Sequence, residues 1–359
     1  MKVALVYDRV NKWGGAERVL LVLHQLFPKA PLYTSVYNPK TAQWAEVFRV
    51  RTSFLQNIPF ASSFHELLAP FMPFAFMSFS FERYDVVISI TSEYAKAIRV
   101  TGKTIHICYC LTPTRYLWSG YREYFRNKYF RFIAKPVILL LRFWDKRISS
   151  NPHYFVSISQ EVKNRVKKYY KRDSQVVYPP VTILNKKNKS SHTLSGYFLI
   201  VSRLVPYKRI DIAITACNSL KVPLIIIGKG SEEKRLKKIA GSSVFFINNL
   251  TDEELSGYYK NCKALLFPGK EDFGLSIVEA QGFGKPVIAY KKGGAAEIIK
   301  EGKTGIFFDH QRKESLIKTI KKFEKMHFNP LACKLQAEKF TQKQFKKEFM
   351  KVIKEVLKK

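Results

Sequence analysis

Short apolar runs alternate with helix-like segments along nearly the whole chain, and this alternation constrains the fold more than any other feature. Residues 3–8 (VALVYD) read as a buried parallel strand, and Gly14 and Gly15 separate them from an amphipathic helical pattern. A second series of strands, turns and helices starts with the apolar run at 197–202. This order predicts an α/β protein with doubly wound parallel sheets.

Paired prolines and a polar, lysine-rich run divide the two series. The run follows VVYPPV and is typical of an interdomain linker. We therefore predict an N-terminal Rossmann-like domain over residues 1–180, a linker over 181–196 and a C-terminal Rossmann-like domain over 197–340. The final segment, 341–359, has the pattern of an amphipathic basic helix, and we expect it to pack back on the N-terminal domain.

The composition indicates a polyanionic partner. The chain of 359 residues carries 62 Lys and Arg against 28 Asp and Glu, a formal net charge of +34. Nucleic acid, an anionic membrane face and phosphorylated substrates all fit such an excess, and so does a surface that is merely rich in lysine. The charge is spread over the chain without an RRM, KH or zinc-finger pattern, which argues against nucleic acid.

The five cysteines show neither a CxxC pair nor zinc-ligand spacing, and we expect buried thiols in a reducing compartment and no metal site. The N-terminus reads as a strand, not as a signal peptide, and no uninterrupted apolar run approaches the ~20 residues that span a bilayer. We therefore expect a cytoplasmic protein, with peripheral attachment to the inner membrane as an option.

Two strand ends carry groups suited to a phosphate. In SRLVPYKR, Arg203 and Lys208 follow an apolar run, and a guanidinium with an ammonium can clamp a diphosphate. A solvated basic loop is the alternative. Gly14 and Gly15 would let the backbone and a helix N-terminus approach an anion, although they also suit a plain turn. The absence of G-x-G-x-x-G argues against a nicotinamide dehydrogenase.

A third strand end carries two glutamates. Glu271 lies on the turn before a predicted helix, and Glu279 lies about two turns further on. Both could serve one ligand. Equally, Glu271 could only complement the helix dipole, and Glu279 could face solvent. Gly293 and Gly294 mark another strand-to-helix turn.

Together these residues resemble the retaining glycosyltransferases of family four, which have the two-domain GT-B fold with a central cleft. The resemblance rests on PGKEDFGLSIVEAQGFGKPVIAYKKGGAAEIIKEGKTGIFF, on SRLVPYKR and on WGGAERVL. HICYCLTPTRYLW and SQEVKNRVKKYY with VVYPPV are further similar to the bacterial mannosyltransferase-like branch that builds O-antigens and other surface polysaccharides. The match covers most of the chain.

The resemblance implies a role for each matching residue. Arg203 and Lys208 would bind the donor diphosphate with the backbone of Gly14 and Gly15, and Glu271 would contact the donor sugar. The remaining donor contacts would come from Phe273, Gly274, Leu275, Ser276 and the ribose-binding Glu279. The acceptor would lie against the N-terminal domain near Thr112, Arg115 and Tyr116.

One position departs from the branch. Leu111 stands where the branch has a histidine that would touch the donor sugar, and His106 occupies a different strand position. This departure leaves open an altered donor, an altered register or a catalytically inactive relative that binds a lipid or a partner. The simpler reading of His106 is a core histidine.

The resemblance implies transfer of a sugar from a nucleotide diphosphate to an acceptor hydroxyl with anomeric retention, without a metal or a separate cofactor. GDP-mannose is the first donor that it suggests, and UDP-sugars remain open. The acceptor would be a glycan or a lipid-linked saccharide. A sugar-nucleotide epimerase or another enzyme of the same fold is the alternative.

Residues 121–147 interleave aromatic, aliphatic and basic side chains. This pattern could form a surface helix that lies on an anionic leaflet, or a partly buried helix whose basic side chains pack over the core. The basic residues are Arg122, Arg126, Lys128, Arg131, Lys135, Arg142, Lys146 and Arg147.

Overall fold

A computed structural model of the chain describes residues 1–59, 61, 68–125, 127–183 and 195–358. It contains two β-sheets, and each is built from parallel strands. The contacts divide it into unit 1, Met1–Pro180 with Phe345–Lys359, and unit 2, Val181–Gln344. Residues 184–194 of the predicted linker and Arg126 lie outside the described residues. The expected α/β class with two Rossmann-like sheets is confirmed.

Unit 1 contains a seven-stranded sheet in the order β3-β2-β1-β4-β5-β6-β7, and every strand pair is parallel. The central strands are buried on both faces, as their unbroken apolar runs predict. The strands are β1 (Val3–Tyr7), β2 (Leu32–Thr34), β3 (Val50–Thr52), β4 (Val86–Thr91), β5 (Ile105–Cys110), β6 (Tyr154–Ser157) and β7 (Gln175–Val176).

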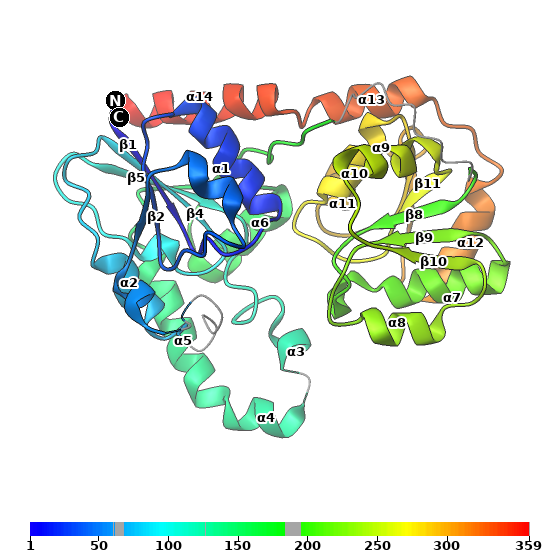
Figure 1. Ribbon diagram of the computed structural model, residues 1–359, viewed down its shortest axis with the longest axis horizontal. Coiled ribbons are helices and arrows are strands. Elements are labelled where there is room, and N and C mark those ends of the chain that lie inside the picture. Colours follow the sequence, from blue (N-terminus) through cyan, green and yellow to red (C-terminus); the bar gives the residue numbers. More distant parts are fainter. Residues whose placement is uncertain (60, 62–67, 126, 184–194, 359) are drawn as a thin grey trace. The chain divides into compact units, whose positions relative to one another are not determined.

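The helices of unit 1 differ in how they meet the core. Helix α1 buries Val19, Leu20, Val22 and Leu23, whereas α4 and the first part of α5 extend away from the sheet (Figure 1). The helices are α1 (Gly15–Leu26), α2 (Met72–Met77), α3 (Tyr121–Tyr124), α4 (Lys128–Ile133), α5 (Lys135–Ile148), α6 (Gln160–Arg165) and most of α14 (Gln342–Leu357). In α14, the rings of Phe345 and Phe349 each lie 5.8 Å from that of Tyr109.

Unit 2 contains a six-stranded parallel sheet in the order β10-β9-β8-β11-β12-β13. The strands are β8 (Phe198–Val201), β9 (Leu224–Ile227), β10 (Val244–Ile247), β11 (Ala264–Phe267), β12 (Val287–Tyr290) and β13 (Gly305–Phe308). Helices α7, α8 and α12 lie on one side of the sheet, and α9, α10 and α11 lie on the other (Figure 1). The helices are α7 (Ile210–Leu220), α8 (Glu233–Ile239), α9 (Asp252–Asn261), α10 (Leu275–Gly282), α11 (Ala295–Ile298), α12 (Lys313–Phe323) and α13 (Pro330–Glu338).

Each sheet reverses its strand order once. The reversal lies between β1 and β4 in unit 1 and between β8 and β11 in unit 2. In open α/β sheets, ligands bind at the carboxyl ends of the strands beside such a reversal. Among the described residues, no helix is long and apolar enough to cross a bilayer.

Candidate active site

The reversal in unit 2 brings together two segments that are far apart in the sequence. Strands β8 and β11 are direct neighbours, with Ala264 opposite Phe198 and Leu265 opposite Leu199. Because the strands are parallel, the loops that follow them meet at the same edge of the sheet. The loop after β8 carries the predicted Arg203 and Lys208, and the loop after β11 carries the predicted Glu271.

Lys208 and Glu271 form an ion pair across these two loops. Lys208 ends the short 3₁₀ helix η5 (Pro206–Lys208), whose proline favours the first helical position. The Lys208 and Glu271 side chains are 11% and 18% exposed, so solvent screens the pair less than a surface pair.

Arg203 is exposed, and among the described residues it pairs with no carboxylate. Its guanidinium donates to the Tyr207 hydroxyl at 2.8 Å. The Lys208 ammonium lies 5.4 Å from the centre of the same tyrosine ring. Tyr207 therefore contacts both cations. Its place between the two cations in SRLVPYKR is the sequence signal that could have pointed to it.

Glycines allow the loops at this edge to approach one another closely. A β-carbon on Gly269 would lie 2.9 Å from the Lys208 Cα, and one on Gly293 would lie 2.3 Å from the Glu271 carbonyl oxygen. A β-carbon on Gly294 would lie 2.0 Å from the Phe273 carbonyl oxygen. These contacts are to backbone, so a larger residue would displace the loops that carry Lys208 and Glu271.

Helix α10 begins beside the ion pair. Gly274 precedes it with φ +121°, a conformation that residues with a β-carbon rarely adopt, and no side chain caps the helix start. The N–H groups of Leu275 and Ser276 have no carbonyl partner inside the helix and lie at its positive dipole end, whereas the Ile277 N–H donates to the Gly274 carbonyl at 3.0 Å. Phe273 is buried and packs edge-on against Phe340 at 5.5 Å.

Glu279 lies on α10 and accepts a hydrogen bond from the Tyr259 hydroxyl at 2.7 Å. The Tyr259 ring stacks on Phe283 at 5.5 Å, with 11° between the planes. The carboxylate is thus oriented by a fixed aromatic side chain. Tyr259 belongs to α9, and no motif in the sequence pointed to it.

The reversal in unit 1 is organised by Asp8, which directly follows β1. Its carboxylate accepts hydrogen bonds from the Thr91 hydroxyl and from the N–H groups of Ser92, Glu93, Tyr94 and Ala95, at 2.7–3.1 Å. One buried carboxylate therefore fixes the turn after β4. No motif in the sequence singled out Asp8.

Gly14 and Gly15 lie at the start of α1 in unit 1. Gly14 is extended, and a β-carbon there would lie 3.1 Å from the Glu17 carboxylate. Glu17 accepts a hydrogen bond from the Tyr7 hydroxyl at 2.6 Å, and burial raises its pKa above the ordinary value. Gly14 and Gly15 belong to a different unit from Arg203 and Lys208.

The predicted acceptor residues lie in the loop after β5. Thr112 is buried and accepts a hydrogen bond from Arg165 at 3.3 Å, and the Tyr116 hydroxyl lies 2.9 Å from that of Tyr94. Arg115 is half-buried, and its carbonyl accepts from the Gly120 N–H at 2.8 Å.

Asp145 of α5 anchors this loop through hydrogen bonds. It is fully buried and accepts from the Thr114 hydroxyl at 2.8 Å, the Trp118 indole at 2.7 Å and the Tyr170 hydroxyl at 2.8 Å. It also pairs with the buried Lys96 at 2.7 Å. Burial opposes the charge on Lys96, but the charge and hydrogen bond of Asp145, together with Asp8 and Cys110, raise the pKa of Lys96.

His106 is a core residue, as the simpler reading predicted. It is fully buried on β5, its Nε2 lies 2.8 Å from the Ser89 hydroxyl, and burial lowers its pKa to about 3. Leu111, which directly follows β5, is half-buried.

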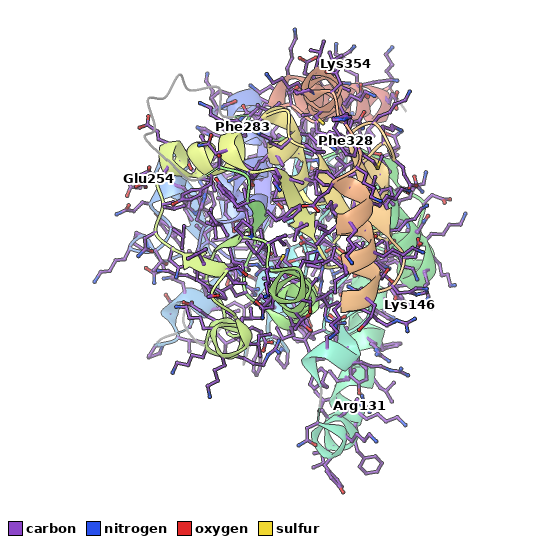
Figure 2. All side chains as sticks on the ribbon, turned by 90° about the vertical axis from the view of Figure 1, so that its right-hand side faces the viewer. Arg131, Lys146, Glu254, Phe283, Phe328 and Lys354 are labelled. Carbon is purple, nitrogen blue, oxygen red and sulfur yellow. The ribbon has the colours of Figure 1, made fainter. Side chains whose placement is uncertain are left out.

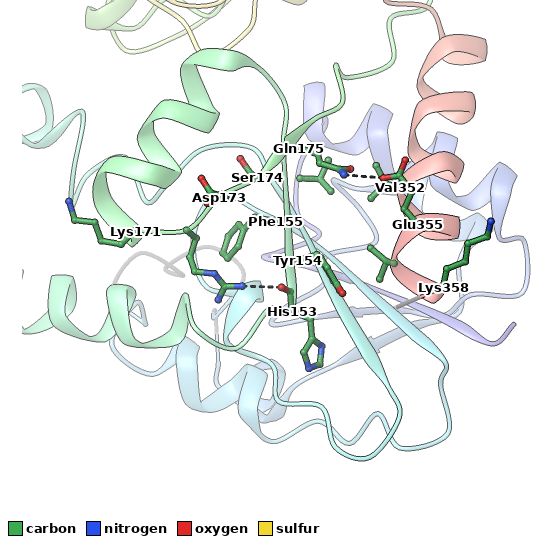
Figure 3. A pocket seen from close by; sticks show the side chains of 13 residues that line it. His153, Tyr154, Phe155, Lys171, Asp173, Ser174, Gln175, Val352, Glu355 and Lys358 are labelled. Atoms are coloured by element: carbon green, nitrogen blue, oxygen red, sulfur yellow. Dashed lines mark hydrogen bonds between the residues drawn. The ribbon is translucent and has the colours of Figure 1, made fainter.

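A groove of about 830 Å³ lies elsewhere in unit 1, between β6, β7 and the end of α14 (Figure 3). Arg172 donates to the His153 carbonyl at 3.0 Å, and Gln175 donates to Glu355 at 3.1 Å along its wall. None of the predicted site residues lines it. Among the described residues, no three His, Cys, Asp or Glu side chains gather as metal ligands.

Comparison with known proteins places the unit 2 site in a known domain. Residues 183–341 match the family described as glycosyl transferases group 1. An O-antigen chain mannosyltransferase C from Escherichia coli is 26% identical over 174 residues, covering 44% of this chain and 45% of that protein. A GDP-mannose-dependent alpha-mannosyltransferase from Corynebacterium glutamicum is 32% identical over 110 residues, covering 30% of this chain and 26% of that protein.

The fold matches over nearly the full length. HepE of Anabaena in complex with UDP superposes with a TM-score of 0.73 at 19% identity and covers 99% of this chain and 100% of that one. By sequence, the chain spans about half the length of the first relatives that it matches. Residues 183–341 therefore match the glycosyl transferases group 1 family, and the chain has the GT-B fold.

Proposed function

We propose that this chain is a retaining glycosyltransferase that moves a sugar from a nucleotide-sugar donor to a glycan or lipid-linked saccharide in surface polysaccharide synthesis. One observation carries the proposal. The Lys208–Glu271 ion pair lies at the strand reversal of the group 1 domain, where α10 also begins without a side-chain cap. This edge of the sheet combines cations, a carboxylate and a helix N-terminus. These groups suit a nucleotide-sugar donor, which has a charged diphosphate and a polar sugar.

The diphosphate would bind to Arg203, Lys208 and the first N–H groups of α10. Negative charge develops on the leaving nucleoside diphosphate as the anomeric bond breaks, and donors that are already in position stabilise that charge. Arg203 can bind two phosphate oxygens, whereas Lys208 acts as a point charge. These groups supply the charge stabilisation for which other transferases use a metal ion.

Donor binding would divide the ion pair. Lys208 would turn from Glu271 to the phosphates, and the freed Glu271 carboxylate would accept hydrogen bonds from donor sugar hydroxyls. We do not assign Glu271 as a nucleophile. Attack of the acceptor on the same face as the departing phosphate accounts for retention without a covalent intermediate.

The rest of the donor would lie along α10. Glu279, oriented by Tyr259, would accept from the ribose hydroxyls, and the backbone from Phe273 to Ser276 would hold the sugar and phosphates. Gly14 and Gly15 would add backbone donors from unit 1. Thr112, Arg115 and Tyr116 would bind the acceptor.

Relatives suggest two donor classes. The Corynebacterium relative is named for GDP-mannose, and HepE was solved with UDP. We propose GDP-mannose as the first donor to test, because the relatives named as mannosyltransferases match this chain by sequence.

The test is a thermal-shift panel of GDP- and UDP-sugars, followed by product analysis with the donor that binds. A ligand at 100 times its dissociation constant adds roughly 2.7 kcal/mol to stability. We expect one nucleotide class to stabilise the protein, and nuclear magnetic resonance of the product to show the donor's anomeric configuration. An inverted product refutes retention, an isomerised donor without transfer favours an epimerase, and no stabilisation by any donor refutes the proposal.

A further inference from the structure

We infer that the arm, which we define as Tyr121–Ile148 with helices α3, α4 and α5, docks this protein on an anionic lipid bilayer. The arm projects from unit 1 in two perpendicular views, with Arg131 toward its free end and Lys146 nearer its base (Figures 1 and 2). The sequence allowed either a surface helix or a partly buried one. The structure has three helices, and most of the side chains that it describes in them are exposed.

Large apolar side chains of the arm face solvent. Tyr129, Phe132, Ile133 and Phe143 are 82%, 77%, 72% and 62% exposed. A helix that is apolar on most of its surface is normally buried in protein or in lipid. The arm's exposed large apolar residues are Tyr124, Tyr129, Phe132, Ile133, Val137, Leu139, Leu140 and Phe143.

The charges of the arm have nearly one sign. Its sequence contains eight Lys and Arg and two acids, Glu123 and Asp145, and Asp145 is already paired with Lys96 inside unit 1. Lys128, Lys135, Lys146 and Arg147 are exposed beside the apolar residues. Cations next to inserted aromatic and aliphatic side chains match an anionic headgroup layer over an acyl layer.

Charge complementarity favours an anionic bilayer over a second copy of this chain as the partner of the arm. A second copy of the arm would place like charges against one another, which costs free energy in an apolar contact. An anionic bilayer accepts the cations and the apolar side chains together. The arm is also too short to cross the bilayer in any of its helices, so it would lie in the interface.

The base of the arm is fixed to the predicted acceptor loop. Asp145 accepts from Thr114 and Trp118, and the Arg142 guanidinium donates to the Leu117 carbonyl at 2.6 Å. Phe74 of α2 packs on Trp144 at 5.4 Å. Docking would therefore hold the loop of Thr112, Arg115 and Tyr116 near the lipid surface, a consequence that rests on the proposed function.

The experiment measures sedimentation of the full chain with phosphatidylcholine vesicles, with and without phosphatidylglycerol. One variant, Phe132→Ser with Ile133→Ser, removes apolar contact, and another, Lys128→Gln with Arg131→Gln and Lys135→Gln, removes charge. The matched controls change exposed residues of unit 2: Leu331→Ser with Leu335→Ser, and Lys321→Gln with Lys322→Gln and Lys325→Gln.

We expect binding to the anionic vesicles only. Each cation near such a surface contributes about fivefold, so the triple charge variant should partition roughly 100-fold less, and the apolar variant at least about tenfold less. All four variants should keep the stabilisation by nucleotide, which separates docking from donor binding. Equal binding to both vesicle types, no binding, or equal losses in the controls overturns the inference.

Discussion

Replacing Lys208 by methionine separates the two roles of its ammonium, because the methionine keeps the apolar stem and loses the charge. In the free protein this leaves Glu271 without its cation. Removing one partner of a fully buried pair costs ~3–5 kcal/mol. Since the two side chains here are 11% and 18% exposed, we expect a loss of about 2 kcal/mol in the free energy of unfolding.

The same substitution removes one charge-assisted contact to the diphosphate. Such contacts contribute ~1.5–3 kcal/mol, which is roughly a 10- to 150-fold weaker Kd for GDP or UDP. In contrast, Glu271→Gln should bind the diphosphate at least as tightly as the wild type, because Lys208 no longer has to leave a carboxylate. Glu271→Gln should still lose sugar transfer.

The double variant Lys208→Met with Glu271→Gln completes the cycle. It should recover most of the lost stability, because no buried charge is left unpaired, but it should not recover wild-type diphosphate affinity. Urea unfolding and calorimetric titration with GDP and UDP measure the two quantities separately. If folded Lys208→Met binds the nucleotide as tightly as wild type, the reasoning about Lys208 is refuted.

Two further tests concern the surroundings of the site and the core of unit 1. Gly269→Ala places a β-carbon 2.9 Å from the Lys208 backbone and should weaken diphosphate binding at least about tenfold. Its control is Gly302→Ala, at a position with φ +76° and no atom within 4 Å of the added β-carbon, which should cost only ~1–2 kcal/mol of stability and leave binding intact. Equal diphosphate binding by the two alanine variants would contradict this prediction. Burial lowers the pKa of His106 to about 3, so below about pH 6.5 the native state binds fewer protons than the unfolded state. The free energy of unfolding therefore decreases as the pH is lowered, by about 2 kcal/mol from neutral pH to pH 5. His106→Gln should remove this part of the pH dependence of urea unfolding, and an unchanged slope would show that His106 is not its source.

The strands and helices that follow a local hydrophobic pattern could be predicted from the sequence. Apolar runs followed by glycine turns, as at Gly14 and Gly274, set the strands and the helix starts, and the confirmed fold class follows from their order. His106 was also anticipated as a core residue in the simpler of two readings, and it is fully buried on β5 beside the Ser89 hydroxyl.

Contacts between distant segments could not be read from the sequence. The pairing of Lys208 with Glu271 depends on β8 and β11 being neighbours, which only the strand order establishes. Asp145 lies in a basic stretch of the sequence, and no motif pointed to it. Its carboxylate accepts the hydrogen bonds from Thr114 and Trp118 that connect α5 to the loop after β5. The sequence left a surface helix and a partly buried helix both open for residues 121–147, and the exposure of Phe132 follows from α4 leaving the core.

The most direct measurement of the central claim compares nucleoside diphosphates with nucleosides. Calorimetric titration of the full chain with GDP, UDP, guanosine and uridine, at low and high salt, isolates what the cations and α10 contribute to affinity. The account predicts that one diphosphate binds at least about tenfold more tightly than its nucleoside, and that the difference shrinks in Lys208→Met. Equal affinity for diphosphate and nucleoside, or a difference that Lys208→Met leaves unchanged, would contradict it.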